Sequence, residues 1–327
     1  MHAPSRVVAN EEIAGQLGLE AEQIFKSSGI RRRHWAEPQT TTSSLACVAL
    51  THALADAALA AEEVDYLLFG TMTPDRFIPG SASAVQKSAG LREIPCLDIR
   101  ATCCNALYGL QLAQALVASG AARRVAVCLA EIQSAWLDLS PAGGTLSMLF
   151  GDGAAAFIVS NEPRERAFQI VDILLATDGS YVDDLGIRSP GTEFGNTRTH
   201  GAGEFASDFD ARMNGQAVIL QASRRMSAAC QALLQRNNLT VADVRWIVPH
   251  QANANLLVGL ARSLRFPSSE AGGEVVNLLE DYGNTSSASM GIALDSLRRT
   301  GRVAAGDYLL LPAFGAGFTW GAGLCRA

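Results

Sequence analysis

The feature that most constrains the fold is an order of short apolar runs and helical stretches that occurs twice in the 327 residues. Short apolar runs are typical of buried strands, and strands that alternate with helices predict a mainly parallel sheet covered on both faces. Because the order is repeated, we predict two such sheets packed into one five-layered α/β unit.

The first half has predicted strands at 64–69, 96–99, 124–129 and 154–159, and predicted helices at 81–89 and 103–119. The second half has predicted strands at 246–249, 275–278 and 308–311 and a last one after Gly317, with helices ending near Leu264 and spanning 286–299. Residues 163–166 mark the join, which predicts domains 1–165 and 166–327. Residues 178–206 lack periodicity, and we expect a long surface excursion that serves as a lid or substrate channel.

Composition and motifs exclude several classes of function. A net charge of −6 argues against nucleic acid as the main partner. Neither a GxxxxGK[ST] loop, an HExxH helix nor metal-ligand spacing is present, so no metal is expected. The sequence has no apolar run of about 18 residues and no signal-peptide pattern, so no membrane contact is expected. Seven cysteines without a CxxC pattern predict free thiols and a cytoplasmic location.

Cys103 is the first candidate for chemistry. A predicted strand delivers it to the start of a long helix, where free N–H groups and the helix dipole favour a thiolate and lower the pKa of the thiol. The alternative is a buried structural thiol, which is the more frequent role of an isolated cysteine. We interpret Cys104 as a packing residue.

Two further candidates also follow predicted strands. His250 stands where a strand ends and a helix begins, which is where sites open in α/β folds. Asn284 lies in the segment DYGNTSSAS of residues 281–289. Taken alone, His250 is more often structural or solvated, and Asn284 is more often a turn or capping residue.

A glycine-rich segment precedes the last predicted strand. Gly315, Ala316 and Gly317 are small enough to let the backbone approach a ligand and direct N–H groups at an oxyanion. The alternative is a tight turn between two strands. The segment 151–156 (GDGAAA) mimics a dinucleotide fingerprint, but it leads into a strand rather than a helix, so no dinucleotide site is expected.

Together these segments resemble the β-ketoacyl-ACP synthase III group of the thiolase superfamily, over about residues 10–327. The resemblance rests on these segments: 29–34 (GIRRRH), 150–154 (FGDGA), 250–253 (HQAN), 283–286 (GNTS) and 314–321 (FGAGFTWG). It implies a thiolase-like fold of two βαβαβαββ halves in five αβαβα layers. Cys103, His250 and Asn284 match the catalytic cysteine, histidine and asparagine of that group.

The resemblance implies an acyltransferase with ping-pong chemistry. An acyl group passes from a thioester to Cys103, and backbone N–H groups of Cys103 and residues 315–317 hold the oxyanion. A malonyl-type thioester then loses carbon dioxide against His250 and Asn284, and its enolate attacks the acyl-enzyme. The implied partners are acyl carrier protein, acyl-CoA and a second identical subunit. A phosphopantetheine thioester is the substrate carrier, and no cofactor is expected.

The sequence departs from the group at the acyl-donor entrance. Gln23, Ser27 and Gly143 stand where relatives that use acetyl-CoA place a Trp and two Arg, which predicts weaker binding of the CoA nucleotide. Phe77 and Ile78 lie where the group closes its acyl pocket across the dimer, and an isoleucine there predicts a longer acyl chain. The group's opening strand, expected in the centre of a sheet, is not recognisable before Ala3.

Two other functions remain open at this stage. The acyl group can pass to an oxygen, nitrogen or carbon acceptor in place of a malonyl enolate. Alternatively, the chain is a non-catalytic partner subunit of a condensing complex, although an intact Cys, His and Asn argue against that hypothesis. A departure at the donor entrance favours a specialised fatty-acid or secondary-metabolite pathway over ordinary fatty-acid initiation.

Overall fold

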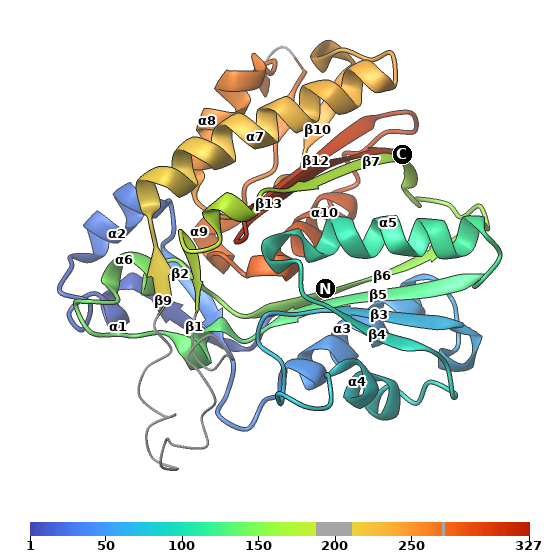
Figure 1. The fold of residues 1–327 in the computed structure, drawn as a ribbon, viewed down its shortest axis with the longest axis horizontal. Coiled ribbons are helices and arrows are strands. Elements are labelled where there is room, and N and C mark those ends of the chain that lie inside the picture. The colour runs from blue at the N-terminus through green and yellow to red at the C-terminus, as the bar shows by residue number, and fades with distance from the viewer. Residues whose placement is uncertain (188–210, 270–271) are drawn as a thin grey trace.

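The structure is a computed structural model that describes residues 1–187, 211–269 and 272–327. Figure 1 shows five layers, in which two sheets enclose a central pair of helices and each sheet is covered on its outer face by two more. The helices of these layers are α7 (Gly215–Arg236) and α8 (Ala254–Leu264) outside the C-terminal sheet, α5 (Asn105–Ala118) and α10 (Ser289–Arg299) in the centre, and α3 (Thr42–Asp56) and α4 (Ala82–Ser88) outside the N-terminal sheet. The five-layered α/β architecture predicted from the repeat is confirmed.

The two sheets share one topology. The N-terminal sheet has the order β4 (Cys96–Ile99), β3 (Tyr66–Gly70), β5 (Arg124–Glu131), β6 (Gly153–Ser160). The C-terminal sheet has the order β11 (Glu274–Val275), β10 (Val244–Ile247), β12 (Tyr308–Gly315), β13 (Thr319–Arg326), β7 (Gln169–Thr177). In both, the first three strands are parallel and the fourth is antiparallel. The sheets fall on either side of residues 161–168, while the exact domain boundary stays a prediction.

Shorter helices and strands pack at one end of the layers. They are β1 (Arg6–Ala9), α1 (Asn10–Ile13), α2 (Ala21–Ser28), β2 (Arg32–Trp35), α6 (Gly144–Ser147), β8 (Leu185–Ile187), β9 (Ala211–Met213) and α9 (Leu279–Tyr282). Of the predicted excursion at 178–206, residues 188–206 lie outside the described residues. Three of the larger elements were not predicted: α3, which covers the N-terminal sheet, α7, which covers the C-terminal sheet, and β7, which forms the edge of the C-terminal sheet.

The edge of β6 distinguishes the two halves. In the C-terminal sheet, β7 pairs with β13 along its whole length. At the matching position beside β6, the part of the chain that the structure describes provides one antiparallel bridge, between His2 and Ala154. Beyond that bridge a cavity of about 740 Å³ runs along β6, lined by its residues 156–160 and by Met1 and His52. The described strands of the N-terminal sheet, β4-β3-β5-β6, are hydrogen-bonded neighbours throughout, so this sheet offers a place for a further strand beside β6 and none in its centre, where the opening strand was expected.

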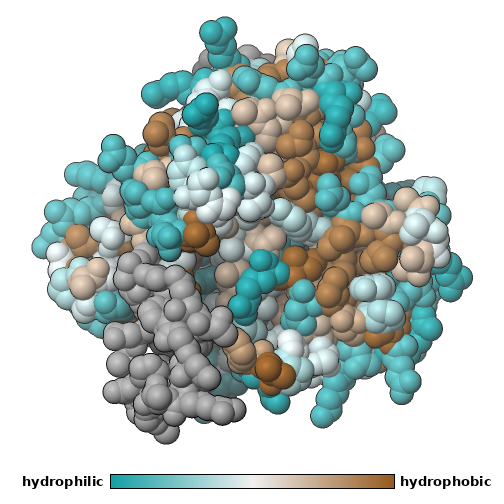
Figure 2. Space-filling model, viewed as in Figure 1, coloured by the Kyte–Doolittle hydropathy of each residue, from teal (hydrophilic) through white to brown (hydrophobic). Residues whose placement is uncertain are grey.

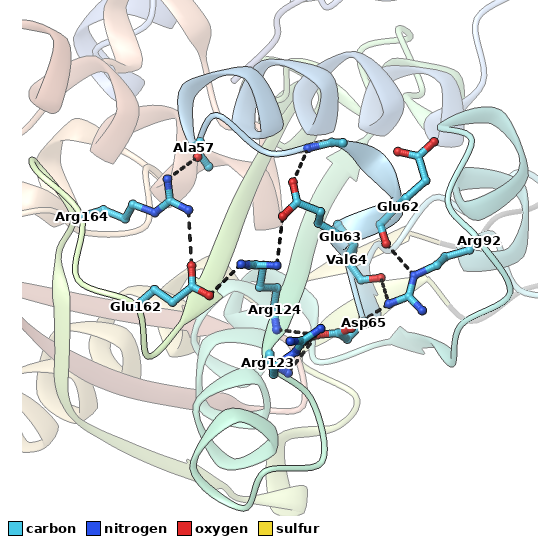
Figure 3. Close-up of polar contacts among 11 residues, drawn as sticks. Ala57, Glu62, Glu63, Val64, Asp65, Arg92, Arg123, Arg124, Glu162 and Arg164 are labelled. Atoms are coloured by element: carbon cyan, nitrogen blue, oxygen red, sulfur yellow. Dashed lines mark hydrogen bonds and ion pairs between the residues drawn. The ribbon is translucent and has the colours of Figure 1, made fainter.

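Ion pairs gather at the end of the N-terminal sheet where β5 begins (Figure 3). Arg124 contacts Glu63 at 3.1 Å and Glu162 at 2.7 Å, and Arg164 joins Glu162 to the carbonyl of Ala57. Surface pairs of this kind contribute about 1 kcal/mol or less each. They tie the ends of β3, β5 and β6 together at one edge, and the candidate site lies at the opposite end of the same strands.

Candidate active site

Cys103 lies in a 3-10 turn, Thr102–Cys104, between β4 and α5. Its Sγ is 3.6 Å from the Oγ of Ser286, which is 183 residues away in the sequence. The preceding Thr102 has a φ of 52° and donates from Oγ1 to the carbonyl of Ala316 at 3.2 Å. A non-glycine residue in the left-handed region costs about 1–3 kcal/mol, so the surrounding contacts hold this turn in place.

Gly315 lies directly against this turn. A Cβ atom at position 315 would sit 2.2 Å from Thr102 Oγ1 and 2.9 Å from the backbone nitrogen of Cys103. Only a glycine allows the end of β12 to approach Cys103 so closely. The predicted glycine-rich segment is therefore brought against the predicted nucleophile.

His250 follows β10 and is buried. Its Nδ1 is 2.6 Å from the Oγ of Ser289, and that oxygen also accepts the backbone N–H of Gln251 at 3.1 Å. In the tautomer that carries the ring proton on Nε2, the serine hydroxyl donates to Nδ1 while its oxygen accepts the hydrogen bond of Gln251, and Nε2–H is left to donate to a ligand. Burial lowers the pKa of His250 to about 4, so the ring is neutral near pH 7 and presents an N–H donor.

Asn284 lies in a turn bonded on both sides to the loop before β6. Its N–H donates to the carbonyl of Leu149 at 2.8 Å, and its carbonyl accepts the N–H of Gly151 at 3.0 Å. Its Oδ1 accepts the N–H of Ser286 at 2.9 Å, which leaves the side-chain amide nitrogen as a donor for a ligand.

The segment 284–289 brings the three candidates together. Ser286 contacts Cys103, Ser289 contacts His250, and Asn284 begins the same segment. The structure thus collects Cys103, His250 and Asn284 around one turn, with Gly315 beside it. The catalytic roles assigned to these residues stay predictions.

The predicted low pKa of Cys103 is wrong for this structure. Burial raises the pKa of the Cys103 thiol to about 11, although a hydrogen bond with Ser286 acts in the opposite direction. The α-helix itself begins only at Asn105, so Cys103 belongs to the preceding 3-10 turn. Cys104 is fully buried with its Sγ 3.4 Å from the carbonyl of Thr319, as expected of a packing residue.

Sequence reasoning missed several residues that shape the site. Ser286 contacts Cys103 and Ser289 contacts His250, while the backbone N–H of Gln251 donates to the hydroxyl of Ser289. Glu131 is buried with its carboxyl bonded to Ser287. Gln251 and Ser286 lie inside the motifs 250–253 and 283–286, and Ser289 follows the second motif by three residues, so membership of a motif or position beside one was the available signal. Nothing local to Glu131 marks it, because its partners come from distant segments.

Gln23, Ser27 and Gly143, which differ from the residues of relatives that use acetyl-CoA, lie at the predicted acyl-donor entrance. Gln23 caps α2 by accepting the N–H of Glu20, and Ser27 Oγ bonds back to the carbonyl of Gln23. A Cβ at Gly143 would lie 2.1 Å from the carbonyl of Asp138, so no larger residue fits there without a backbone shift. Phe77 and Ile78 are 74% and 78% exposed in the single chain, and their assignment to the acyl pocket stays a prediction.

A metal site and a membrane-spanning helix are two further possibilities for the described ranges. No group of three or more His, Cys, Asp or Glu side chains there could hold a metal ion, and none of the described helices is long and apolar enough to cross a membrane. All seven cysteines are free, as predicted. The expectation that the reaction needs no cofactor stays a prediction.

Comparison with known proteins identifies relatives over the whole chain. Sequence models for 3-oxoacyl-[acyl-carrier-protein (ACP)] synthase III match residues 97–179 and, for its C-terminal part, residues 234–327. The β-ketoacyl-[acyl-carrier-protein] synthases III of Oleidesulfovibrio alaskensis and Nitratidesulfovibrio vulgaris are 36% and 38% identical, over 99% of this chain and 96% of theirs.

Solved structures agree with this assignment. A 3-oxoacyl-[acyl-carrier-protein] synthase III from Aquifex aeolicus superposes with a TM-score of 0.87 at 30% identity, over 100% of this chain and 97% of that one. The priming β-ketosynthase of the R1128 polyketide pathway gives a TM-score of 0.86 at 30% identity, over 99% and 93%. These likenesses confirm the predicted thiolase-like fold with its two duplicated halves.

Proposed function

Because the chain belongs to the β-ketoacyl-[acyl-carrier-protein] synthase III family, we propose that it condenses an acyl thioester with a malonyl-type thioester in two half-reactions. The observation that carries the proposal is the single turn that joins Ser286 to Cys103 and Ser289 to His250, with Asn284 at its start. A thiol, a neutral imidazole and a side-chain amide held by one segment of the chain are the groups that this chemistry needs.

In the first half-reaction the thiolate of Cys103 attacks the thioester carbonyl. The new carbon–sulfur bond forms, and backbone N–H groups of Cys103 and the 315–317 segment hold the oxyanion. The carbon–sulfur bond of the donor thioester then breaks, and the pantetheine thiolate that leaves takes up from solvent the equivalent of the proton that Cys103 gave up. Ser286 supports this step, because its hydroxyl lies 3.6 Å from Sγ and lowers the pKa of the thiol. Reaction therefore begins from a thiol that is mostly protonated at pH 7.

In the second half-reaction His250 and Asn284 act on the malonyl thioester. Loss of carbon dioxide leaves negative charge on the thioester oxygen, and two neutral N–H donors stabilise it without a proton transfer. The enolate carbon then attacks the acyl carbonyl, and the Cys103 sulfur leaves as thiolate. The product is a β-ketoacyl thioester, and no cofactor takes part in these steps.

The proposal includes a homodimer in the cytoplasm. Figure 2 shows apolar side chains gathered over the middle of the face on which α5 lies. Exposed apolar residues of this chain include Leu97 on the edge strand β4 and Leu112 on α5, at 44% and 39%, together with Phe77 and Ile78. A second copy on the β4 edge would cover these residues and bring Phe77 and Ile78 to the neighbouring acyl pocket.

An acyl carrier protein is the proposed carrier of at least one substrate. The exposed face of α7 and α8 combines apolar Ile219, Leu220 and Val258, each 58–62% exposed, with exposed Arg262 and Arg265. Apolar contacts with nearby arginines suit an acidic carrier domain.

Variants of the two donors test the proposed division of roles. His250→Ala and Asn284→Ala should still accept an acyl group from a thioester, because Ser286 and the backbone at Cys103 remain. Their decarboxylation of a malonyl thioester should fall by about 10²–10³, as for other oxyanion donors. Unimpaired release of carbon dioxide in either variant contradicts the roles. If wild-type protein becomes acylated but releases no carbon dioxide from a malonyl substrate, the acceptor is a different nucleophile.

A further inference from the structure

Glu131 is a fully buried carboxyl group at the end of β5 that the proposed reaction does not use, and burial raises its pKa to about 7 although its hydrogen bonds act in the opposite direction. Its Oε1 accepts the hydroxyl of Ser287 at 2.5 Å, and its Oε2 accepts the N–H of Met72 at 3.0 Å and the hydroxyl of Thr73 at 3.1 Å. Thr71 adds a fourth contact at 3.4 Å. The side chain of Glu131 therefore joins three segments: the end of β5, to which it belongs, the loop after β3 and the turn before α10.

Among the described elements that pack most closely against β5, none brings a cation to Glu131, and Arg124 lies at the opposite end of β5 itself. The helices, strands and turn packed against β5 are α3, α5, β3, β6 and the 3-10 turn Ser286–Ala288, and none carries Lys or Arg. Their titratable side chains are Cys47, His52, Asp56, Tyr66 and Tyr108. A buried carboxyl without a counter-charge destabilises the fold unless several hydrogen-bond donors satisfy it. An apolar side chain would pack at position 131 without that cost, so the contacts of Glu131 point to a role other than core packing.

The turn that Glu131 holds is the one that assembles the site. Ser287 follows Ser286, whose φ of 48° places it in the left-handed region and whose hydroxyl contacts Cys103. The N–H of Ser286 also holds the Oδ1 of Asn284. A strained residue keeps its conformation only where its neighbours are fixed, and Ser287 is fixed by Glu131.

We propose that Glu131 is a positioning residue that, through Ser287, holds Ser286 against Cys103 and orients the amide of Asn284. The inference rests on the proposed function for its second part, since the orientation of Asn284 matters for the malonyl step. The first part concerns only the thiol and its hydroxyl partner. Loss of the anchor should therefore affect the malonyl step and the ionisation of Cys103 even when the fold is intact.

Two variants remove the anchor from opposite ends. Glu131→Gln keeps the shape of the side chain but turns one acceptor into a donor, and Ser287→Ala removes the hydroxyl that it binds. Each should lower decarboxylation roughly tenfold to a hundredfold, the range expected for loss of a hydrogen bond to a charged group, while acylation falls less. The double variant should be no slower than the slower single variant, because both remove one interaction.

Iodoacetamide labelling of Cys103 provides an arm that is independent of the substrate. In Ser287→Ala the pH midpoint of labelling should move upwards, because Ser286 no longer holds the thiolate as well. This arm uses Ser287→Ala, since Glu131→Gln also removes a negative charge that raises the pKa of the thiol.

The outcomes separate the inference from the proposed function. A Ser287→Ala protein with a wild-type labelling midpoint and wild-type decarboxylation overturns the inference, and so does a double variant whose losses add. If Glu131→Gln does not fold, Ser287→Ala alone decides by the same two measurements. If wild-type protein fails to decarboxylate but the midpoint moves as expected, the positioning role stands and the proposed function fails.

Discussion

Ser286 makes two contributions to the site at the scale of a single residue. Its hydroxyl lies 3.6 Å from the Sγ of Cys103, and its N–H fixes the Oδ1 of Asn284. Substitution by alanine removes the first contribution and keeps the second, because the backbone N–H remains. Burial raises the pKa of Cys103 to about 11. Below that pH the thiolate is the minor form, and its fraction grows about tenfold for each pH unit.

Ser286→Ala should therefore label more slowly with iodoacetamide, by roughly tenfold at a fixed pH below 11, because the pKa of Cys103 rises further. In both proteins the labelling rate should keep rising above pH 9, as followed by intact-protein mass. Ser227→Ala is the matched control, since that hydroxyl is buried on α7 without a hydrogen-bond partner. Equal labelling rates of Ser286→Ala and wild type would contradict the proposed effect of the Ser286 hydroxyl on the pKa of Cys103.

Individual residues also show where prediction from sequence ends. Cys103, His250 and Asn284 could be nominated because each stands in a specific motif. Ser286 stands in one of these motifs but its contact with Cys103 could not be predicted, and Glu131 could not be nominated at all, since both roles depend on contacts between segments more than 150 residues apart. The pKa of Cys103 was mispredicted because a rule about helix termini considers the local backbone, whereas burial depends on the packed whole.

At the scale of elements, the sequence predicted most strands correctly and several helix starts too early. Predicted helices at 103 and 286 begin as 3-10 turns, Thr102–Cys104 and Ser286–Ala288, with the α-helices starting at Asn105 and Ser289. Both turns contain a non-glycine residue with positive φ. The left-handed conformation is disfavoured for a threonine or a serine, and here it is imposed by the packing of the two turns against each other.

The open edge of β6 leads to a prediction about stability. The His2–Ala154 bridge is antiparallel, so a chain that continues ahead of Met1 enters the cavity alongside residues 156–160. A variant extended ahead of Met1 by seven alternating valines and threonines should pair with β6 as β7 pairs with β13. Its melting temperature should rise by several degrees, about 2–4 °C for each kcal/mol gained.

A matched extension with proline at alternate positions is the control, because proline cannot donate to the strand ladder. Calorimetry of the two extended proteins and the unextended one decides the point. Equal melting temperatures for the two extensions would show that β6 does not accept a strand.

At the scale of the whole molecule, we expect surfaces from distant parts of the chain to determine which acyl donor is used. Gln23 and Ser27 on α2 and Gly143 before α6 stand at the proposed donor entrance, where they provide neither a stacking ring nor a cation for a CoA nucleotide. Loss of one charged contact costs roughly 1.5–3 kcal/mol, so binding of free CoA thioesters should weaken well over tenfold. Free acetyl-CoA should then be a poor donor compared with longer or carrier-bound acyl groups.

Steady-state kinetics with acetyl-CoA, octanoyl-CoA and their carrier-protein counterparts measures this preference. The variant Gln23→Trp with Ser27→Arg restores a ring and a cation, and should lower KM for acetyl-CoA while leaving the carrier-bound donor unchanged. A kcat/KM for acetyl-CoA equal to or above the values for octanoyl-CoA and the carrier-bound donors would contradict this prediction and would indicate ordinary fatty-acid initiation.

The central claim is that Cys103 carries the acyl group. Its most direct test is the intact mass of the protein after incubation with a panel of acyl-CoA and acyl-carrier thioesters. Wild type and Cys104→Ala should each gain the mass of one acyl group, and Cys103→Ala, which trims one small side chain in a 3-10 turn, should gain none while remaining folded. A Cys103→Ala protein that still gains the acyl mass, or a wild type that gains none from any donor, would contradict the account.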